Sequence, residues 1–154
     1  MIRVVVGELG KEAVDAVLRP ADATLAPVGA AAVRLDELGG EDFAKERRTA
    51  TPLEAGAAVV TGAGALAAGF VLHVVVADER GAAGREQVRR ALVSAWQRAG
   101  DWGLARVAAP LVGRRMQAII RIEVVLPAPL GPSRPNSSPR GTSRSMPSTA
   151  VNLP

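Results

Sequence analysis

Short apolar runs alternate with longer amphipathic or polar segments along the first three-quarters of the chain. The run at 2–6 is β-branched, which is typical of a strand covered on both faces, and glycines punctuate its end. Residues 14–18 predict a second buried strand that ends at Arg19-Pro20, because proline disfavours helix in the residue before it. Further apolar runs predict strands at 57–61, 70–76 and 105–109, the last stopping at Pro110.

Two segments between these strands have helical character. Residues 30–38 are rich in Ala and Leu and precede Gly39-Gly40, which suits a helix closed by a left-handed glycine. Residues 83–99 place apolar side chains at helical spacing with charged side chains on the opposite face, and Gly100 is expected to end this helix. Buried strands that alternate with helices predict an α/β domain built on a largely parallel sheet.

The composition narrows the possible functions. A length of 154 residues leaves room for one compact domain, and four aromatic residues are too few for base-stacking platforms. The absence of cysteine and the single histidine exclude disulfides, structural zinc and thiol nucleophiles; no cofactor is predicted, and a metal would be at most Mg²⁺ or Ca²⁺ held by carboxylates. No apolar stretch approaches the ~20 residues of a spanning helix, and the first residues do not resemble a signal peptide. We therefore predict a cytoplasmic protein without membrane contact.

The charge divides the chain into two parts. Residues 1–113 carry 13 basic and 14 acidic side chains, whereas 114–154 carry six Arg, the single acid Glu123 and seven of the eleven Pro. We predict a domain at 1–113 and an Arg/Pro/Ser-rich tail at 114–154, with an extra strand at 118–126 and the remainder disordered. A basic arm for nucleic acid is the functional alternative, but so few arginines spread over the tail favour a solvated segment.

The loops that follow the strands are the places to look for a ligand site. Pro27-Val28-Gly29 precedes a predicted helix, where free N–H groups and the helix dipole can hold a phosphate. Gly62-Ala63-Gly64 precedes no strongly periodic helix, which favours a plain turn over a phosphate loop.

Three titratable residues have both a functional and a structural interpretation. His73 lies among Val and Leu, which favours a hydrogen-bonded core histidine over a catalytic base, and no Ser or Asp pattern around it forms a triad. Asp22 and Asp36 could pair with a ribose or a water, whereas the structural interpretation is a helix cap or a solvated charge.

Several short motifs have counterparts, in the same order and spacing, in one known family. A first strand that runs into Gly-Asp-Ile is similar to the segment ending in Gly7-Glu8-Leu9, and a Val-Asp-Ala-Ile-Val strand is similar to 14–18. The Asn-Ala-Ala-Asn that follows matches Arg19-Pro20-Ala21-Asp22, and a glycine run entering a helix matches Pro27-Val28-Gly29-Ala30. A Gly-Glu-Ala-x-x-Thr strand and a strand ending Val-Ile-His are similar to 56–61 and 71–73. Residues 2–113 thereby resemble the macro domain, an ADP-ribose-binding module.

The resemblance implies a three-layer α/β/α fold with a mixed, largely parallel sheet, and a partner that is ADP-ribose or an ADP-ribosylated protein. It implies that Glu8 accepts a hydrogen bond from adenine, that amides around Gly29 hold the diphosphate, and that Asp22 lies near the distal ribose. Asp22 replaces an Asn often tied to hydrolysis in the family, which disfavours an ADP-ribosyl hydrolase, and no catalytic residue is predicted. A scaffold or interaction protein with a decayed pocket is the other alternative. The expected ligand-binding residues are Glu8, Leu9, Ala21, Asp22, Val28, Gly29, Ala30, Ala31, Leu111 and Gly113.

The resemblance stops at Gly113, where the family continues with a Gly-rich loop, a helix and a final strand. Here Arg114-Arg115-Met116-Gln117 follows, and the composition after residue 126 resembles translation of GC-rich DNA in an unintended frame. We therefore expect an incomplete domain and hypothesise a frameshift or misjoined gene near codon 114. The oligomeric state stays open; without a strand at 119–126, an unpaired sheet edge would favour dimer pairing or aggregation.

Overall fold

A computed structural model describes residues 1–48, 52–112 and 120–125, with the backbone alone at 120–124. No helix among these residues is long and apolar enough to span a membrane. The elements follow one another as β1 (Ile2–Val6), η1 (Leu9–Lys11), β2 (Ala16–Asp22), α1 (Ala30–Glu46), β3 (Ala58–Gly62), β4 (Phe70–Asp78), β5 (Gly81–Ala82), α2 (Arg85–Asp101), β6 (Arg106–Pro110) and β7 (Ile120–Val125).

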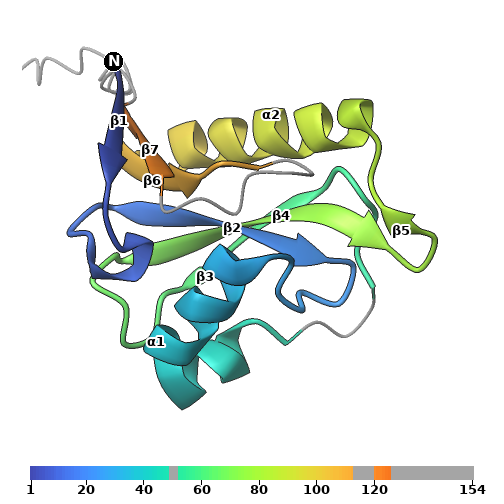
Figure 1. Cartoon of the computed structure of the whole chain (residues 1–154), viewed down its shortest axis with the longest axis horizontal. Coiled ribbons are helices and arrows are strands. Elements are labelled where there is room, and N and C mark those ends of the chain that lie inside the picture. The colour runs from blue at the N-terminus through green and yellow to red at the C-terminus, as the bar shows by residue number, and fades with distance from the viewer. Residues whose placement is uncertain (49–51, 113–119, 126–154) are drawn as a thin grey trace, which may run out of the picture.

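The elements form three layers, with α1 on one face of a central sheet and α2 on the other (Figure 1). The strand order is β1-β7-β6-β2-β4-β3, and β5 pairs with β4. β2 runs parallel to β4 and β6, whereas β7 is antiparallel to both β6 and β1, and β3 and β5 are antiparallel to β4. Consequently β1, β6, β2 and β4 all point in one direction. The expected α/β/α architecture with a mixed sheet is confirmed.

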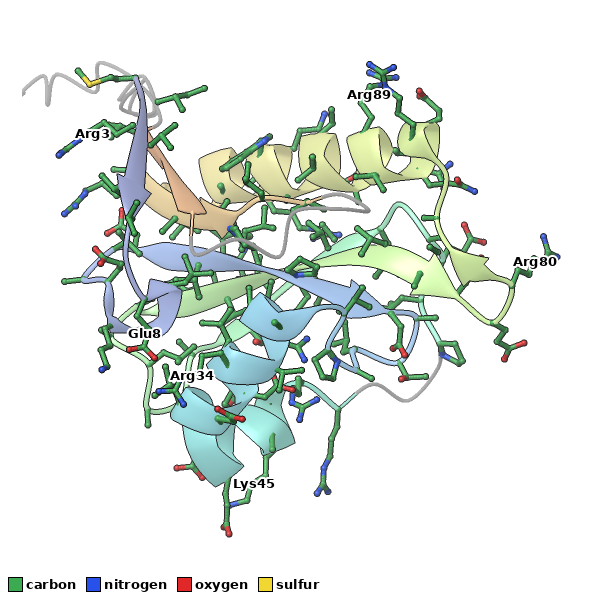
Figure 2. All side chains as sticks on the ribbon, viewed as in Figure 1. Arg3, Glu8, Arg34, Lys45, Arg80 and Arg89 are labelled. Carbon is green, nitrogen blue, oxygen red and sulfur yellow. The ribbon has the colours of Figure 1, made fainter. Side chains whose placement is uncertain are left out.

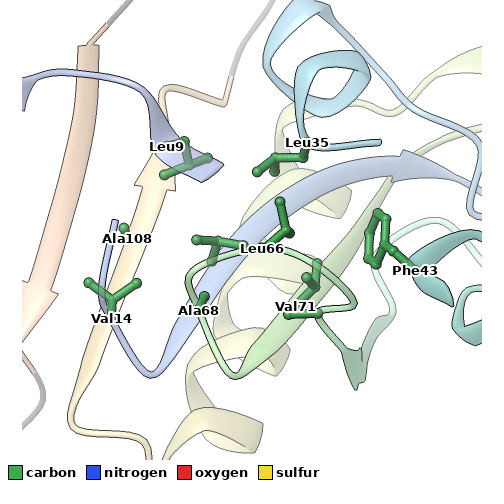
Figure 3. Packing of buried hydrophobic residues seen from close by; sticks show 10 residues of the cluster. Leu9, Val14, Leu35, Phe43, Leu66, Ala68, Val71 and Ala108 are labelled. Carbon is green, nitrogen blue, oxygen red and sulfur yellow. The ribbon is translucent and has the colours of Figure 1, made fainter. Parts of the chain in front are cut away.

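Small and medium apolar side chains fill the core on both faces of the sheet. Under α1, Leu9 of η1 and Leu35 and Phe43 of α1 pack against Val17 and Val71 of the sheet (Figure 3). Under α2, a stripe of alanines lets the helix lie close to the sheet; it comprises Ala91, Ala95 and Ala99.

The second strand differs from the prediction, because β2 continues through Pro20 to Asp22 instead of ending before the proline. The carbonyl of Pro20 accepts a hydrogen bond from the Val28 amide at 3.1 Å, on the side of β2 away from β4. The N atom of Pro20 faces the same side, where β6 pairs with β2 only at Ala16 and Val17. The missing N–H therefore removes no bond from the ladder, and proline is tolerated inside the strand.

The first helix is longer than predicted. Its first part ends at Gly40, whose φ of 71° is the expected left-handed glycine, but a second short helical stretch continues to Glu46. The charged segment after the glycines is thus part of α1, and its buried Phe43 packs in the cluster under this helix. α2 likewise runs one residue past Gly100 to Asp101.

The first strand has the predicted bounds, but the expectation that both of its faces are covered is wrong. β1 is the last strand of the sheet, and Ile2, Val4 and Val6 are 67%, 66% and 78% exposed. β7 lies within the stretch 118–126 for which a strand was predicted. The prediction of disorder for the rest of the tail concerns residues outside those that the structure describes.

Candidate ligand-binding site

The carboxyl end of β2 is organised by the side chain of Asp22. Its Oδ1 accepts hydrogen bonds from the Thr24 amide (2.8 Å), the Thr24 hydroxyl (2.8 Å) and the Ala26 amide (2.9 Å). Partial burial opposes ionisation, but the hydrogen bonds from Thr24 and Ala26 outweigh it and lower the pKa of Asp22. This ionised carboxylate holds a tight turn in which Leu25 has a positive φ of 64°.

The chain then enters α1 without a side-chain cap. The N-cap residue is Gly29, with φ 89° and ψ 164°, a backbone conformation restricted to glycine. Gly29 and Ala30 are exposed and Ala31 is half-buried. Within the described residues the amides of these three residues have no hydrogen-bond acceptor, as expected for the first turn of a helix. The site therefore presents main-chain N–H groups and the positive end of a helix dipole.

The segment that follows β6 shares an apolar cluster with Val28, the residue before Gly29. Val28 and Val112 pack against one apolar cluster that includes Leu18 of β2 and Ala109 of β6. Gly113, one of the expected ligand-binding residues in this segment, lies outside the described residues. Leu111 is half-buried.

Glu8 is connected to α1 by an ion pair. Its carboxylate lies 2.7 Å from Nε of Arg34 and 2.8 Å from Nζ of Lys11 (Figure 2). Hydrogen bonds from Lys11 and then Arg34 lower the pKa of Glu8. Arg34 is four residues after Ala30, so the backbone of this partner of Glu8 lies about one helical turn after the start of α1. The neighbouring Leu9 and, on β2, Ala21 are buried.

A buried arginine that sequence reasoning did not single out lies beneath the Asp22 turn. Arg19 is fully buried, and its Nε and Nη2 donate to the two carboxylate oxygens of Asp36 at 2.7 and 2.9 Å. Its Nη1 donates to the carbonyl of Leu25 at 3.0 Å and to Nδ1 of His73 at 3.2 Å. Arg47 also contacts Asp36, at 3.3 Å. Asp36 is thus neither a solvated charge nor a helix cap, so both of its predicted structural roles are wrong.

The buried arginine also fixes the state of His73. Since Arg19 only donates, Nδ1 of His73 accepts and the ring proton lies on Nε2, which donates to the Thr61 hydroxyl at 2.8 Å. Burial, followed by the charges of Arg19 and Arg47, lowers the pKa of His73 to about 3. The ring stacks on Phe43 with centroids 5.8 Å apart. The prediction of a hydrogen-bonded core histidine is confirmed.

The predicted turn at Gly62-Ala63-Gly64 packs against α1. Gly64 has a φ of 57°, and a Cβ there would lie 2.6 Å from the carbonyl of Gly39. This close approach explains the glycine without a phosphate.

A concavity lies at the carboxyl end of β4, with a volume of about 440 Å³. It contains none of the predicted ligand-binding residues. No group of three acidic or histidine side chains that could hold a metal occurs in the described parts of the chain. The cleft is lined by Ala23, Pro52, Leu53, Glu54, Ala55, Asp78, Glu79, Arg80, Gln87 and Arg90.

Comparison with known proteins identifies the class to which this α/β/α fold belongs. The macro domain family model matches residues 19–118. An uncharacterised protein of Aeropyrum pernix is 30% identical over 140 residues, covering 86% of this chain and 71% of its own length. One from Aquifex aeolicus is 32% identical over 113 residues, covering 73% and 68%. The chain belongs to the macro domain family.

Solved macro domains have the same fold at low sequence identity. The macro domain of ganglioside induced differentiation associated protein 2 superposes with a TM-score of 0.56 at 18% identity, covering 66% of this chain. This chain spans about half of that one, 52%. The Oceanobacillus iheyensis macrodomain with ADP superposes with a TM-score of 0.54 at 14% identity, and the match covers 70% of this chain and 67% of that one. The Trypanosoma brucei macrodomain in complex with ADP-ribose superposes with a TM-score of 0.52 at 22% identity, and the match covers 62% of this chain and 40% of that one.

The comparisons bear on the hypothesised junction near codon 114. A match that covers 86% of this chain necessarily extends past residue 113, and the family match ends at residue 118. A change of reading frame at codon 114 predicts that similarity ends there. The Aeropyrum pernix alignment therefore argues against that hypothesis.

Proposed function

We propose that this macro domain binds ADP-ribose or a related ADP-ribosyl ligand at the N-terminus of α1. The observation that carries the proposal is the uncapped start of this helix, where the amides of Gly29, Ala30 and Ala31 have no hydrogen-bond acceptor among the described residues. A diphosphate is the ligand group that such a helix start suits, because it offers oxygen acceptors and negative charge at once. Two solved macro domains with this fold hold ADP or ADP-ribose, which supports a ligand of this class.

Glu8 and Asp22 have secondary roles in this proposal. Glu8 still has oxygen lone pairs that can accept a hydrogen bond from an adenine amine, while Arg34 and Lys11 keep it ionised. Asp22 brings a negative charge close to the proposed diphosphate and so weakens binding. Its Oδ1 is occupied by the turn, so we propose recognition of the ligand rather than its hydrolysis.

Calorimetry with a matched pair of variants tests this site. Gly29 and Gly81 both have a positive φ, 89° and 112°, and a Cβ added at either position would meet no other atom within 4 Å. Gly29→Val and Gly81→Val therefore introduce similar backbone strain, but only the first displaces the proposed cradle. We expect ADP-ribose to bind the wild type and the Gly81 variant, and to bind the Gly29 variant at least tenfold more weakly.

The choice of nucleotide sharpens the same experiment. If the diphosphate is the anchor, ADP binds comparably to ADP-ribose and AMP binds much more weakly. If AMP binds as tightly as ADP, the diphosphate is not the anchor and the proposed binding site at the start of α1 is wrong. No heat from wild type at millimolar ADP-ribose would support the alternative of an interaction protein with a decayed pocket.

A further inference from the structure

The outer edge of β1 combines exposed apolar side chains with unpaired backbone groups. β1 is the end strand of the sheet and no described strand lies beyond it (Figure 1). Its alternate residues Ile2, Val4 and Val6 are among the most exposed large apolar side chains of the described residues. Natural edge strands usually carry charges, proline or a bulge that prevents pairing, but β1 has only Arg3.

The hydrogen-bond register shows which backbone groups face outward. Met1 and Val125 exchange two bonds, Met1 N to Val125 O at 3.2 Å and Val125 N to Met1 O at 2.9 Å. Bonded and non-bonded pairs alternate along an antiparallel ladder, so the backbone N–H and C=O groups of Arg3 and Val5 point toward β7. The N–H and C=O groups of the three exposed apolar residues therefore point away from the sheet.

The same three residues lie on one face. In the register Ile2 is opposite Val124, which is opposite Val107, and Val107 belongs to the cluster under α2. Residues opposite one another in antiparallel strands share a face. The apolar side of β1 is thus a continuation of the α2 face, beyond the part of the sheet that α2 covers.

We propose that β1 pairs antiparallel with β1 of a second copy of this chain, about a two-fold axis at Val4. This register makes Val4 a bonded pair with its counterpart and places Ile2 opposite Val6 of the second copy, which uses every outward-facing N–H and C=O of the three residues. Their side chains form one apolar stripe across the axis. On the other face Arg3 lies opposite Val5 rather than opposite its own counterpart, so no like charges meet.

The self-complementarity of the strand selects a second copy as its occupant. A two-fold interface needs the same surface on both subunits, and this five-residue strand supplies matching donors, acceptors and apolar groups. A single strand pair buries less than the ~800 Å² per partner of stable complexes, so the dimer is weak and concentration-dependent.

Sedimentation of the full chain with matched variants tests the proposal. Val4→Arg places two charges opposite one another at the axis, whereas Val93→Arg adds the same charge at an exposed valine of α2. We expect wild type and the Val93 variant to pass from the 15.9 kDa monomer to a dimer with rising concentration. The Val4 variant should need at least a tenfold higher concentration. Equal dimerisation of all three proteins, or wild type that stays monomeric up to millimolar concentration, would overturn the proposal.

Hydrogen exchange distinguishes edge pairing from another dimer contact. The amides of Ile2, Val4 and Val6 should become protected only at dimer-forming concentrations, whereas those of Arg3 and Val5 should be protected at every concentration. Protection of the first set in the monomer would show that this chain covers its own edge, and species larger than a dimer would exclude two-fold pairing. Either result rejects the proposed interface.

Discussion

Arg19 and β1 reverse the usual placement of charged and apolar residues in opposite ways. The guanidinium of Arg19 lies in the core with four hydrogen bonds, to Asp36, Leu25 and His73. The apolar side chains of β1 lie in solvent at the edge of the sheet. The first region is nearly complete within one chain: every nitrogen of the Arg19 guanidinium has a partner, and among the described residues only Nε of the adjacent Arg47 is buried without one. The second is incomplete, because its side chains and its outward backbone groups lack partners in the described parts of the chain.

The difference shows that a candidate interface is distinguished from a structural feature by groups that lack partners within the chain, and not by residue type. A buried arginine with every contact satisfied fixes neighbouring segments in place: Arg19 ties β2, the Asp22 turn, α1 and β4 together. An exposed apolar strand with unsatisfied backbone groups is open to a partner. Substitutions at Arg19, His73 and Asp22 test this distinction by removing its contacts one at a time.

The largest effect is expected from removal of the buried guanidinium. Arg19→Met leaves Asp36 and the Leu25 carbonyl without their main partner, and we expect a loss of about 3 kcal/mol in the free energy of unfolding in urea. Arg89→Ala is the control, because it breaks an exposed ion pair with Glu86 and should leave the unfolding midpoint unchanged. An Arg19→Met midpoint equal to that of wild type would mean that the network contributes nothing to stability.

The second largest effect is a pH dependence that only His73 can produce. A folded-state pKa of about 3, against 6.5 in the unfolded chain, means that the unfolded state alone gains a proton as the pH falls below 6.5. Stability is therefore complete above pH 6.5 and decreases as the pH falls toward 3. From pH 6.5 to 5 we expect a loss of about 2 kcal/mol.

Substitution of the only histidine isolates this contribution. Most carboxylates titrate below pH 5, so the window between pH 5 and 6.5 belongs to His73. His73→Gln keeps a polar partner for Arg19 and should make unfolding nearly independent of pH there, whatever its absolute stability. Wild type with an equally flat profile would contradict a neutral, buried imidazole.

A smaller effect is expected at the turn beneath the proposed cradle. Asp22→Ala removes the acceptor of three hydrogen bonds and should cost about 1 kcal/mol of stability. Asp22→Asn keeps an acceptor oxygen but removes the charge, so it should retain most of that stability while binding ADP-ribose several-fold more tightly. If both variants bind as wild type does, the Asp22 charge does not reach the ligand.

The sequence predicted the elements better than their surroundings. The bounds of β1 followed from the four β-branched residues that surround Arg3. The exposure of β1 could not be predicted in this way, because it depends on which strand lies at the edge of the sheet. The passage of β2 through Pro20 was missed since the local preference of proline says nothing about where a neighbouring strand diverges.

The proposed site was foreseeable where it depends on the backbone and unforeseeable where it depends on distant side chains. Pro27-Val28-Gly29 before a predicted helix indicated an anion-binding helix start, although one glycine in that turn is a weak signal. The pairing of Arg19 with Asp36 joins residues 17 positions apart on different elements, and no local spacing announces it. An arginine directly after a predicted buried strand was the one available signal, because a charge that becomes buried requires a partner.

Backbone amide shifts during an ADP-ribose titration test the proposed cradle most directly. The largest perturbations are expected at the amides of Gly29, Ala30 and Ala31, with smaller ones at Glu8 and Asp22. Perturbations confined to Glu54, Asp78 and Arg80, which line the separate cleft at the end of β4, would contradict a cradle at the start of α1.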